Sequence, residues 1–287
     1  MIKFQRAVLG STLLAAAFPL FASDLAPDDI IIRNHPQHFI TYDGSASVAG
    51  NALQSFEYTV KVNTPLDVDN VYYMINQYFR DPRPAYDPVT GIINLTPTYS
   101  GVMYSGIQPH SDGTVGFRFS TFIAGSKPKN DQCHDGADGG AGVTCALDHV
   151  AYTPGGQYTI KIEKTTTDSS SVTYKGTVTD QTTGIGYTIG EWSLPLPQIG
   201  DLDARFIGAI EKYHIPSGTR CSVIPLVNAE YSNLLYNGKP AATKVSLRKM
   251  TPAPDGSDQY TCAGIPRSTS ATVTPTASGY IIKNSDG

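Results

Sequence analysis

The sequence predicts an all-β protein, an antiparallel β-sandwich or jelly roll like those of lectins, with few or no long helices. Short segments alternate polar and apolar residues, which is typical of half-buried strands. Turns carrying Gly, Pro, Asp or Asn separate these segments at short intervals. The chain also holds 17 tyrosines, and tyrosine suits half-buried strand positions.

The clearest strand signal is Ser55–Val62, in which four large apolar side chains alternate onto one face. Residues 68–79 are rich in Tyr and Val and fit either a strand or a short helix. A hairpin is expected between 172–179 and 185–192, and Asn237–Gly238 is a strong turn signal. Further strands are predicted at 92–99, 103–108, 115–123, 157–163, 206–213, 244–250 and 279–283.

The N-terminus has the pattern of a secretory signal peptide over residues 1–22. Lys3 and Arg6 precede an apolar run at 7–21, and Ala22 is a suitable cleavage point. The run is too short, and too often interrupted by polar residues, for a membrane span. We therefore predict an exported protein, secreted or periplasmic, with no membrane span after signal cleavage.

The rest of the chain is predicted to form one β-sandwich domain over 23–250. All-β domains often reach this length undivided. Residues 251–287 are rich in Thr, Ser and Pro and are expected to pack on the sandwich or to be tethered to it. With 25 acidic and 21 basic residues the chain has a net charge of −4, which disfavours nucleic acid as a partner.

Four cysteines in an exported chain predict two disulfides. Of the three pairings, Cys133–Cys145 with Cys221–Cys262 is favoured, because sequence neighbours close loops without crossing the domain. The second bond would tether the C-terminal segment. No CxxC pair or HExxH motif occurs, so a zinc site is not predicted.

The segment Asn130–Asp148 is the most unusual of the chain. It combines two cysteines, a histidine, acidic residues and several glycines, and irregular segments of this length are often functional. Its oxygen-bearing side chains make calcium a candidate cofactor, although the spacing is not that of an EF-hand. The alternative is a disulfide-closed loop whose acids face water. The candidate calcium ligands are Asn130, Asp131, Asp135 and Asp138.

Gln108 and His110 are two residues apart, so on an extended strand both side chains point to one face. An amide and an imidazole placed there could neutralise a uronate and move a proton, and the pair resembles the Gln-x-His element of jelly-roll alginate lyases. The alternative is a turn with a surface histidine, since Pro109 disfavours a central strand.

Glycoside hydrolysis needs a pair of carboxyl groups. The spacing of the glutamates does not choose among them. Glu191 precedes Trp192, the only tryptophan, which would act either as a sugar-stacking platform or as a core residue. The candidates are Glu57, Glu163, Glu191, Glu211 and Glu230.

Several motifs in the middle of the chain follow a recognisable order. The matching residues are Phe119, Ser120 and Phe122, then Gly136, Gly139, Gly140 and Gly142, then Tyr152, Gly155, Gly156 and Tyr158, and finally Gly208 and Glu211. Over roughly residues 100–235 the chain resembles a family of secreted bacterial domains, domain-of-unknown-function family 3472. The resemblance implies an extracellular β-sandwich in a carbohydrate-associated setting, and it carries over no catalytic residue.

Together these patterns predict a secreted binding protein that recognises a glycan, or another cell-surface component, through loops and a tyrosine-rich face. One alternative is a polysaccharide-active enzyme, either a lyase or a glycoside hydrolase, with Gln108 and His110 as catalytic candidates. A second is a structural or host-interaction protein without a small ligand. The candidate ligand-binding residues are His134, Asp135, Asp138, Tyr152 and Trp192.

Overall fold

The computed structural model confirms the predicted antiparallel β-sandwich. It describes residues 38–47, 53–63, 70–80, 85–86, 93–94, 99–196, 201–213, 226–248 and 272–283. Every regular element in these ranges is a strand, and the strands form two large sheets and one small one. No helix in this part of the chain is long and apolar enough to cross a membrane.

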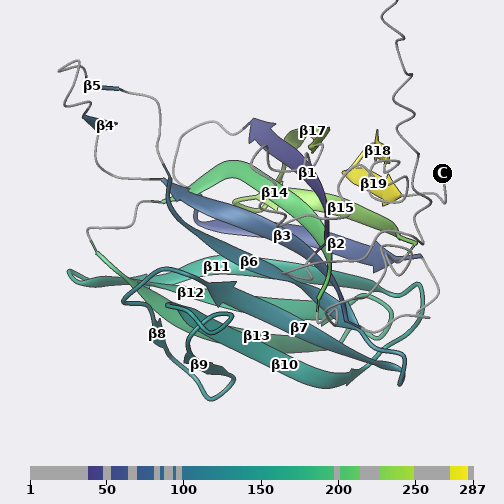
Figure 1. Ribbon diagram of the computed structural model, residues 1–287, viewed down its shortest axis with the longest axis horizontal. Helices are drawn as coiled ribbons and strands as arrows, with labels where there is room; N and C mark the ends of the chain where they lie inside the picture. The colour runs from purple at the N-terminus through teal and green to yellow at the C-terminus, as the bar shows by residue number, and fades with distance from the viewer. Residues whose placement is uncertain are drawn as a thin grey trace, which may run out of the picture.

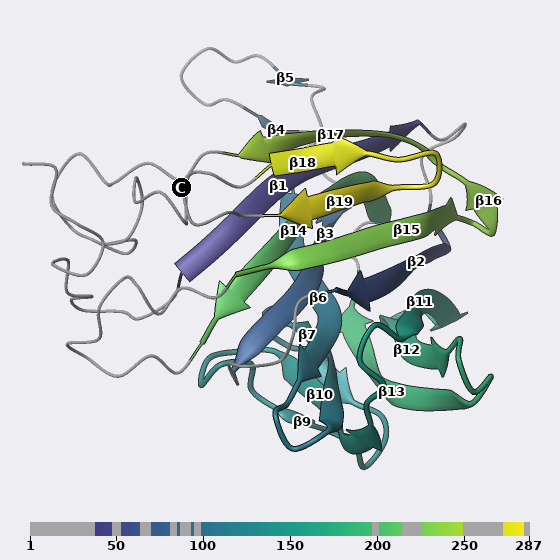
Figure 2. The ribbon, with the colours of Figure 1, turned by 90° about the vertical axis from the view of Figure 1, so that its right-hand side faces the viewer.

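The two large sheets face each other across one core (Figures 1 and 2). In order, the eight-stranded sheet contains β17 (Ala242–Arg248), β1 (His38–Ser47), β14 (Leu202–Lys212), β3 (Val71–Arg80), β6 (Tyr99–Pro109), β7 (Thr114–Thr121), β10 (Val143–Ala151) and β9 (Cys133–Asp135). The nine-stranded sheet contains β18 (Thr272–Pro275), β19 (Tyr280–Lys283), β15 (Asn228–Tyr236), β2 (Ser55–Val62), β11 (Gln157–Thr167), β12 (Ser171–Asp180), β13 (Gly186–Pro195) and β8 (Lys127–Pro128), with β16 (Lys239–Pro240) beside β15. The small sheet pairs β4 (Ala85–Tyr86) with β5 (Ile93–Asn94).

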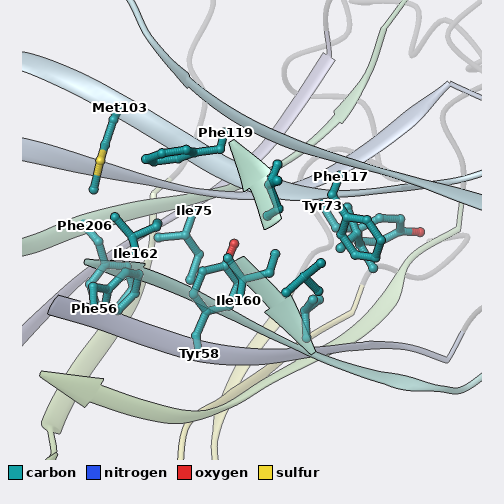
Figure 3. Close-up of a cluster of buried hydrophobic side chains, with 14 of the residues drawn as sticks. Phe56, Tyr58, Tyr73, Ile75, Met103, Phe117, Phe119, Ile160, Ile162 and Phe206 are labelled. Carbon is teal, nitrogen blue, oxygen red and sulfur yellow. The ribbon is translucent and has the colours of Figure 1, made fainter. Parts of the chain in front are cut away.

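The core forms where the apolar faces of the two sheets meet. Alternate residues of each strand point inward, which is why Phe56, Tyr58, Ile160 and Ile162 from one sheet meet Phe117 and Phe119 from the other (Figure 3). The labelled side chains are all buried, and aromatic rings fill much of the volume. Close packing of such large rings also needs small partners. A Cβ at Gly176 would lie 2.6 Å from the Phe119 ring, so this glycine makes room for it.

The strand predictions hold best where alternation is strongest. The predicted strand Ser55–Val62 is β2 with the same bounds, and the ambiguous segment 68–79 is strand β3 rather than a helix. Asn237 and Gly238 both have positive φ, 52° and 72°, as expected for the turn that joins β15 to β16. In the C-terminal segment, residues 272–283 form the hairpin β18–β19, which extends the nine-stranded sheet through β15.

The predicted disulfide Cys133–Cys145 is present. It joins directly opposite positions on β9 and β10 at the edge of the eight-stranded sheet. Its sulfurs pack on Gly190 of β13, where a Cβ would lie 2.6 Å from the Cys133 Sγ, so the bond also ties this edge to the facing sheet. A disulfide indicates an oxidising compartment. The signal segment 1–22 and the predicted pair Cys221–Cys262 lie outside the described residues.

Candidate functional site

Three rows of side chains cross the outer face of the eight-stranded sheet. Strands β14, β3 and β6, which carry most of them, run side by side in Figure 1. The strand register defines the rows, because directly opposite residues share a face. The first row holds Glu211, Tyr72, Gln108 and Gly116; the second holds Ala209, Met74, Gly106, Arg118 and Ala146; the third holds Ile207, Asn76, Tyr104, Ser120, Thr144 and His134.

Glu211 is the unusual group of this face, because it is a carboxyl with only 9% of its surface exposed. Burial, together with the nearby carboxylate of Asp138, raises its pKa from 4.5 to about 7, and burial is the larger cause. A carboxyl in these surroundings is partly protonated at neutral pH. It can therefore donate a proton as well as accept one.

Asp138 comes to this face from the tip of the loop between β9 and β10. The Gly140 N–H donates to the Ala137 carbonyl at 2.8 Å, and the two residues between them, Asp138 and Gly139, have φ of 47° and 76°. These angles are those of a type I′ turn, for which Asp-Gly is a preferred pair. The residue Asp138 is exposed overall, but partial desolvation of its carboxyl raises its pKa.

Two tyrosines lie between these carboxyls. Tyr72 is directly opposite Glu211 and 4% exposed, and its ring meets that of Tyr104 edge-on with centroids 6.0 Å apart. Desolvation raises the pKa of both phenols, and the charge of Glu211 raises each of them further. Gly106 makes room for this arrangement, because a Cβ there would lie 2.8 Å from Tyr72 Cε2 and 2.7 Å from Met74 Cα.

The Tyr72 hydroxyl is buried, and within the described residues it has no hydrogen-bond partner. Leaving a buried hydroxyl unpaired costs on the order of 1–3 kcal/mol. Unlike the unpaired Tyr174 hydroxyl and Trp192 N–H, which lie in the core, the Tyr72 hydroxyl belongs to an outer face, where a ligand hydroxyl can pair with it.

Polar side chains lie on the same face around Tyr72 and Glu211. Arg118 Nη1 donates to Asp148 Oδ1 at 2.7 Å and to the Phe117 carbonyl at 3.0 Å. Arg118 is the one lysine or arginine among the row residues named above, and its charge is paired with that of Asp148. Gln108 is 8% exposed. It lies on the same face as Tyr72, because Ile107 and Tyr73, the residues next to them in the sequence, are directly opposite each other.

Phe122 provides an exposed aromatic surface next to these groups. It follows β7, has 41% of its surface exposed, and its ring centroid lies 5.2 Å from that of Tyr104. An exposed aromatic ring with polar groups beside it offers an apolar surface on which a ligand ring can stack. The carboxyl of Asp138 acts electrostatically on the same Tyr104.

The residues predicted to bind a ligand separate into two groups. Trp192 is fully buried and stacks on Phe119 at 4.6 Å, and Tyr152 is 8% exposed and stacks on Tyr158 at 5.9 Å. Both belong to the core, so neither presents a ring for a sugar, and their predicted ligand role is corrected. Asp138 and His134 do lie at the outer face, and the exposed Asp135 is next to His134 on the edge strand β9.

The two catalytic candidates are also separated by the fold. Gln108 lies on the outer face of β6, near the end of the strand. His110 lies beyond the strand, in the β6–β7 turn, where its N–H donates to the Thr114 carbonyl at 2.8 Å. Pro109 is the last residue of β6, where a missing N–H is tolerated. The Gln-x-His pair therefore does not form one catalytic face.

The candidate calcium ligands do not converge. Among the residues that the structure describes, no three His, Cys, Asp or Glu side chains are placed to hold a metal ion. Asn130 instead faces the neighbouring sheet, where its Oδ1 accepts from the Glu191 N–H at 3.4 Å. Asp131 and Asp135 are exposed. Asp131 and Asp135 therefore agree with the alternative of a disulfide-closed loop with solvated acids, whereas the carboxyl of Asp138 is partly desolvated.

Comparison with known proteins adds little. No family model matches the chain, and no curated protein is similar to it. One similar solved structure is described as that of SCP-B, a member of the eqolisin family of peptidases, in a complex with the tripeptide Ala-Ile-His. It shares 9% identity at a TM-score of 0.40, and the match covers 88% of this chain and 100% of that one. A likeness of this size carries no argument about function, and the resemblance to family 3472 stays a prediction.

Proposed function

We propose that the protein is an exported glycan-binding protein whose binding surface is the outer face of the eight-stranded sheet. The observation that carries this proposal is the exposed Phe122 ring, whose centroid lies 5.2 Å from that of Tyr104, the phenol on which the Asp138 carboxyl acts electrostatically. An aromatic ring can stack on the apolar face of a sugar, while carboxylate oxygens accept hydrogen bonds from its hydroxyls.

A neutral glycan fits this surface better than a polyuronate. The carboxyls of Glu211 and Asp138 would repel a uronate, and the charge of Arg118 is already held by Asp148. Hydroxyl groups of a neutral sugar can instead pair with the Tyr72 hydroxyl, which lacks a partner among the described residues. The predicted signal peptide and the disulfide support export to a compartment where such glycans occur.

A glycan array followed by calorimetry tests the proposal. The protein is expected to bind neutral oligosaccharides, and Phe122→Ala is expected to weaken binding by up to about tenfold, since stacking contributes on the order of 0.5–1.5 kcal/mol. Ile185→Ala is the matched control, because Ile185 is 50% exposed in the β12–β13 turn of the other sheet. Equal losses in both variants, or no glycan bound at all, would refute the proposal.

A further inference from the structure

We propose that Glu211 is the general acid of a glycosidic hydrolysis at this face, with Asp138 as the second carboxyl group. The proposal rests on the glycan-binding function above and adds a reaction to it. Among the five glutamates that the sequence offers, only Glu211 is both buried and in electrostatic contact with another carboxyl among the described residues.

The environment of Glu211 favours the protonated carboxyl that a general acid needs. Desolvation and the charge of Asp138 hold the pKa of Glu211 at about 7. Among the described residues, the other ionisable groups coupled to it are Tyr72 on β3, Tyr104 on β6 and, acting on Tyr72, Arg118 on β7. Both phenols stay neutral because their pKa values are raised, so Asp138 is the charge that acts directly on Glu211.

Two carboxyls alone would not make a site, and the hydroxyl of Tyr72 supplies an independent sign of a ligand. This side chain is 4% exposed, lies directly opposite Glu211, and has no partner for its hydroxyl within the described residues. A sugar hydroxyl bound there would satisfy it and would place the neighbouring glycosidic bond near the Glu211 carboxyl.

The exposure of Asp138 suits the role of the general base, which accepts a proton from water. Since this residue is exposed to solvent on its turn, a water molecule can stand between its carboxylate and the sugar. Glu211 donates its proton to the glycosidic oxygen as the bond to the anomeric carbon breaks and its electron pair goes to that oxygen. The water oxygen bonds to the anomeric carbon and gives its proton to Asp138. Proton exchange with solvent restores both carboxyls, and one water is consumed for each bond cleaved.

The test measures cleavage and binding separately on the full exported chain. Oligosaccharides that bind in calorimetry are incubated with the protein, and released reducing ends are counted. Glu211→Gln is expected to lower kcat by about 10²–10⁴-fold, as for loss of a general acid, while the Kd changes only a few-fold. Glu163→Gln is the matched control, because Glu163 lies on the outer face of the opposite sheet, and its kcat should equal that of the unmodified protein.

The pH profile gives a second readout, and its first part needs only the unmodified protein. Activity of the unmodified protein should fall as pH rises through about 7, where Glu211 loses its proton. Asp138→Asn should lower kcat and move this alkaline limb to lower pH, since removing the Asp138 charge lowers the pKa of Glu211.

The outcomes separate the two proposals. Glycans that bind without being cleaved would overturn the hydrolysis and leave glycan binding intact. Cleavage that persists in Glu211→Gln, or an alkaline limb that does not move in Asp138→Asn, would also overturn it. Absence of any bound glycan would remove both proposals together.

Discussion

The outer faces of the two sheets have the same antiparallel pairing, but their carboxyl groups differ in exposure. On the nine-stranded sheet, Lys161 lies between Glu57 and Thr177 on the neighbouring strands, and its Nζ contacts Glu163 Oε2 at 2.6 Å. The Lys161 and Glu163 side chains are 40% and 34% exposed. Such pairs keep most of their hydration, so they cost little to form and contribute little to stability.

On the eight-stranded sheet the polar groups are removed from water. Glu211 is 9% exposed, Gln108 is 8% exposed and Tyr72 is 4% exposed. Burial of a carboxyl without a described hydrogen-bond partner lowers the free energy of unfolding when the group ionises. The nine-stranded sheet shows that a polar outer face can form with little loss of stability. The burial of Glu211 on the eight-stranded sheet lowers stability, so it calls for a functional explanation.

The largest effect on stability is expected from adding a side-chain atom at Gly106, next to Tyr72. In Gly106→Ala, the new Cβ would overlap the Tyr73 carbonyl oxygen and approach Met74 Cα, both of which belong to backbone. The free energy of unfolding should fall by about 3 kcal/mol or more, since backbone cannot move aside as a side chain can. Urea unfolding monitored by circular dichroism measures the loss.

Gly186→Ala on the nine-stranded sheet is the matched control. The nearest atom to a Cβ at Gly186 would be Thr179 Oγ1, 3.8 Å away, which is an ordinary contact. This variant should unfold within about 0.5 kcal/mol of the unmodified protein. If the two variants lose stability equally, the close packing around Tyr72 is not what distinguishes the two faces.

The pH dependence of stability should separate the faces next. The pKa of Glu211 is 4.5 in a solvated chain and about 7 in the fold, so between these values the folded state binds more protons than the unfolded state. Stability is therefore full below pH 4.5 and falls as pH rises through 7, by about 3 kcal/mol in total. Glu211→Gln should remove this loss and be the more stable protein at pH 8.

Chemical unfolding at a series of pH values checks the sign and the size. Glu163→Gln, on the opposite face, should show the same pH dependence as the unmodified protein. A Glu211→Gln profile that still declines between pH 5 and 8 would mean that another group carries the titration.

Periodicity explains why the fold was easier to predict than the site. The alternation in Ser55–Val62 reports which residues face the core, and β2 has the predicted bounds. In 143–151 and 228–236 the alternation is weaker and polar residues interrupt it, so β10 and β15 were not predicted. The turn residues Asn237 and Gly238 were recognisable because a local backbone conformation demands them.

The site depends on register, which local sequence does not report. Glu211 was one of five equivalent candidates until the pairing of β14 with β3 placed it opposite Tyr72. Tyr72, Tyr104 and Arg118 carry no motif and were missed, and only Arg118, in the alternating segment that became β7, had an outward position that the sequence could have shown. For Trp192 the sequence left both a sugar-stacking platform and a core position open, and the packing against Phe119 places it in the core.

The smallest predicted difference concerns the ion pairs of the two faces. Arg118 and Asp148 are 21% and 40% exposed, and Arg118 is also fixed by the Phe117 carbonyl. A double-mutant cycle with Arg118→Met and Asp148→Asn should give a coupling of about 1 kcal/mol, against about 0.3–0.5 kcal/mol for Lys161→Met with Glu163→Gln. The more enclosed pair should also lose less of its coupling in 0.5 M salt, because screening acts mainly on solvated charges. Equal couplings with equal salt dependence would show that solvent reaches both pairs alike. Tyr72 would then be shielded from solvent on the eight-stranded sheet, but Arg118 would not.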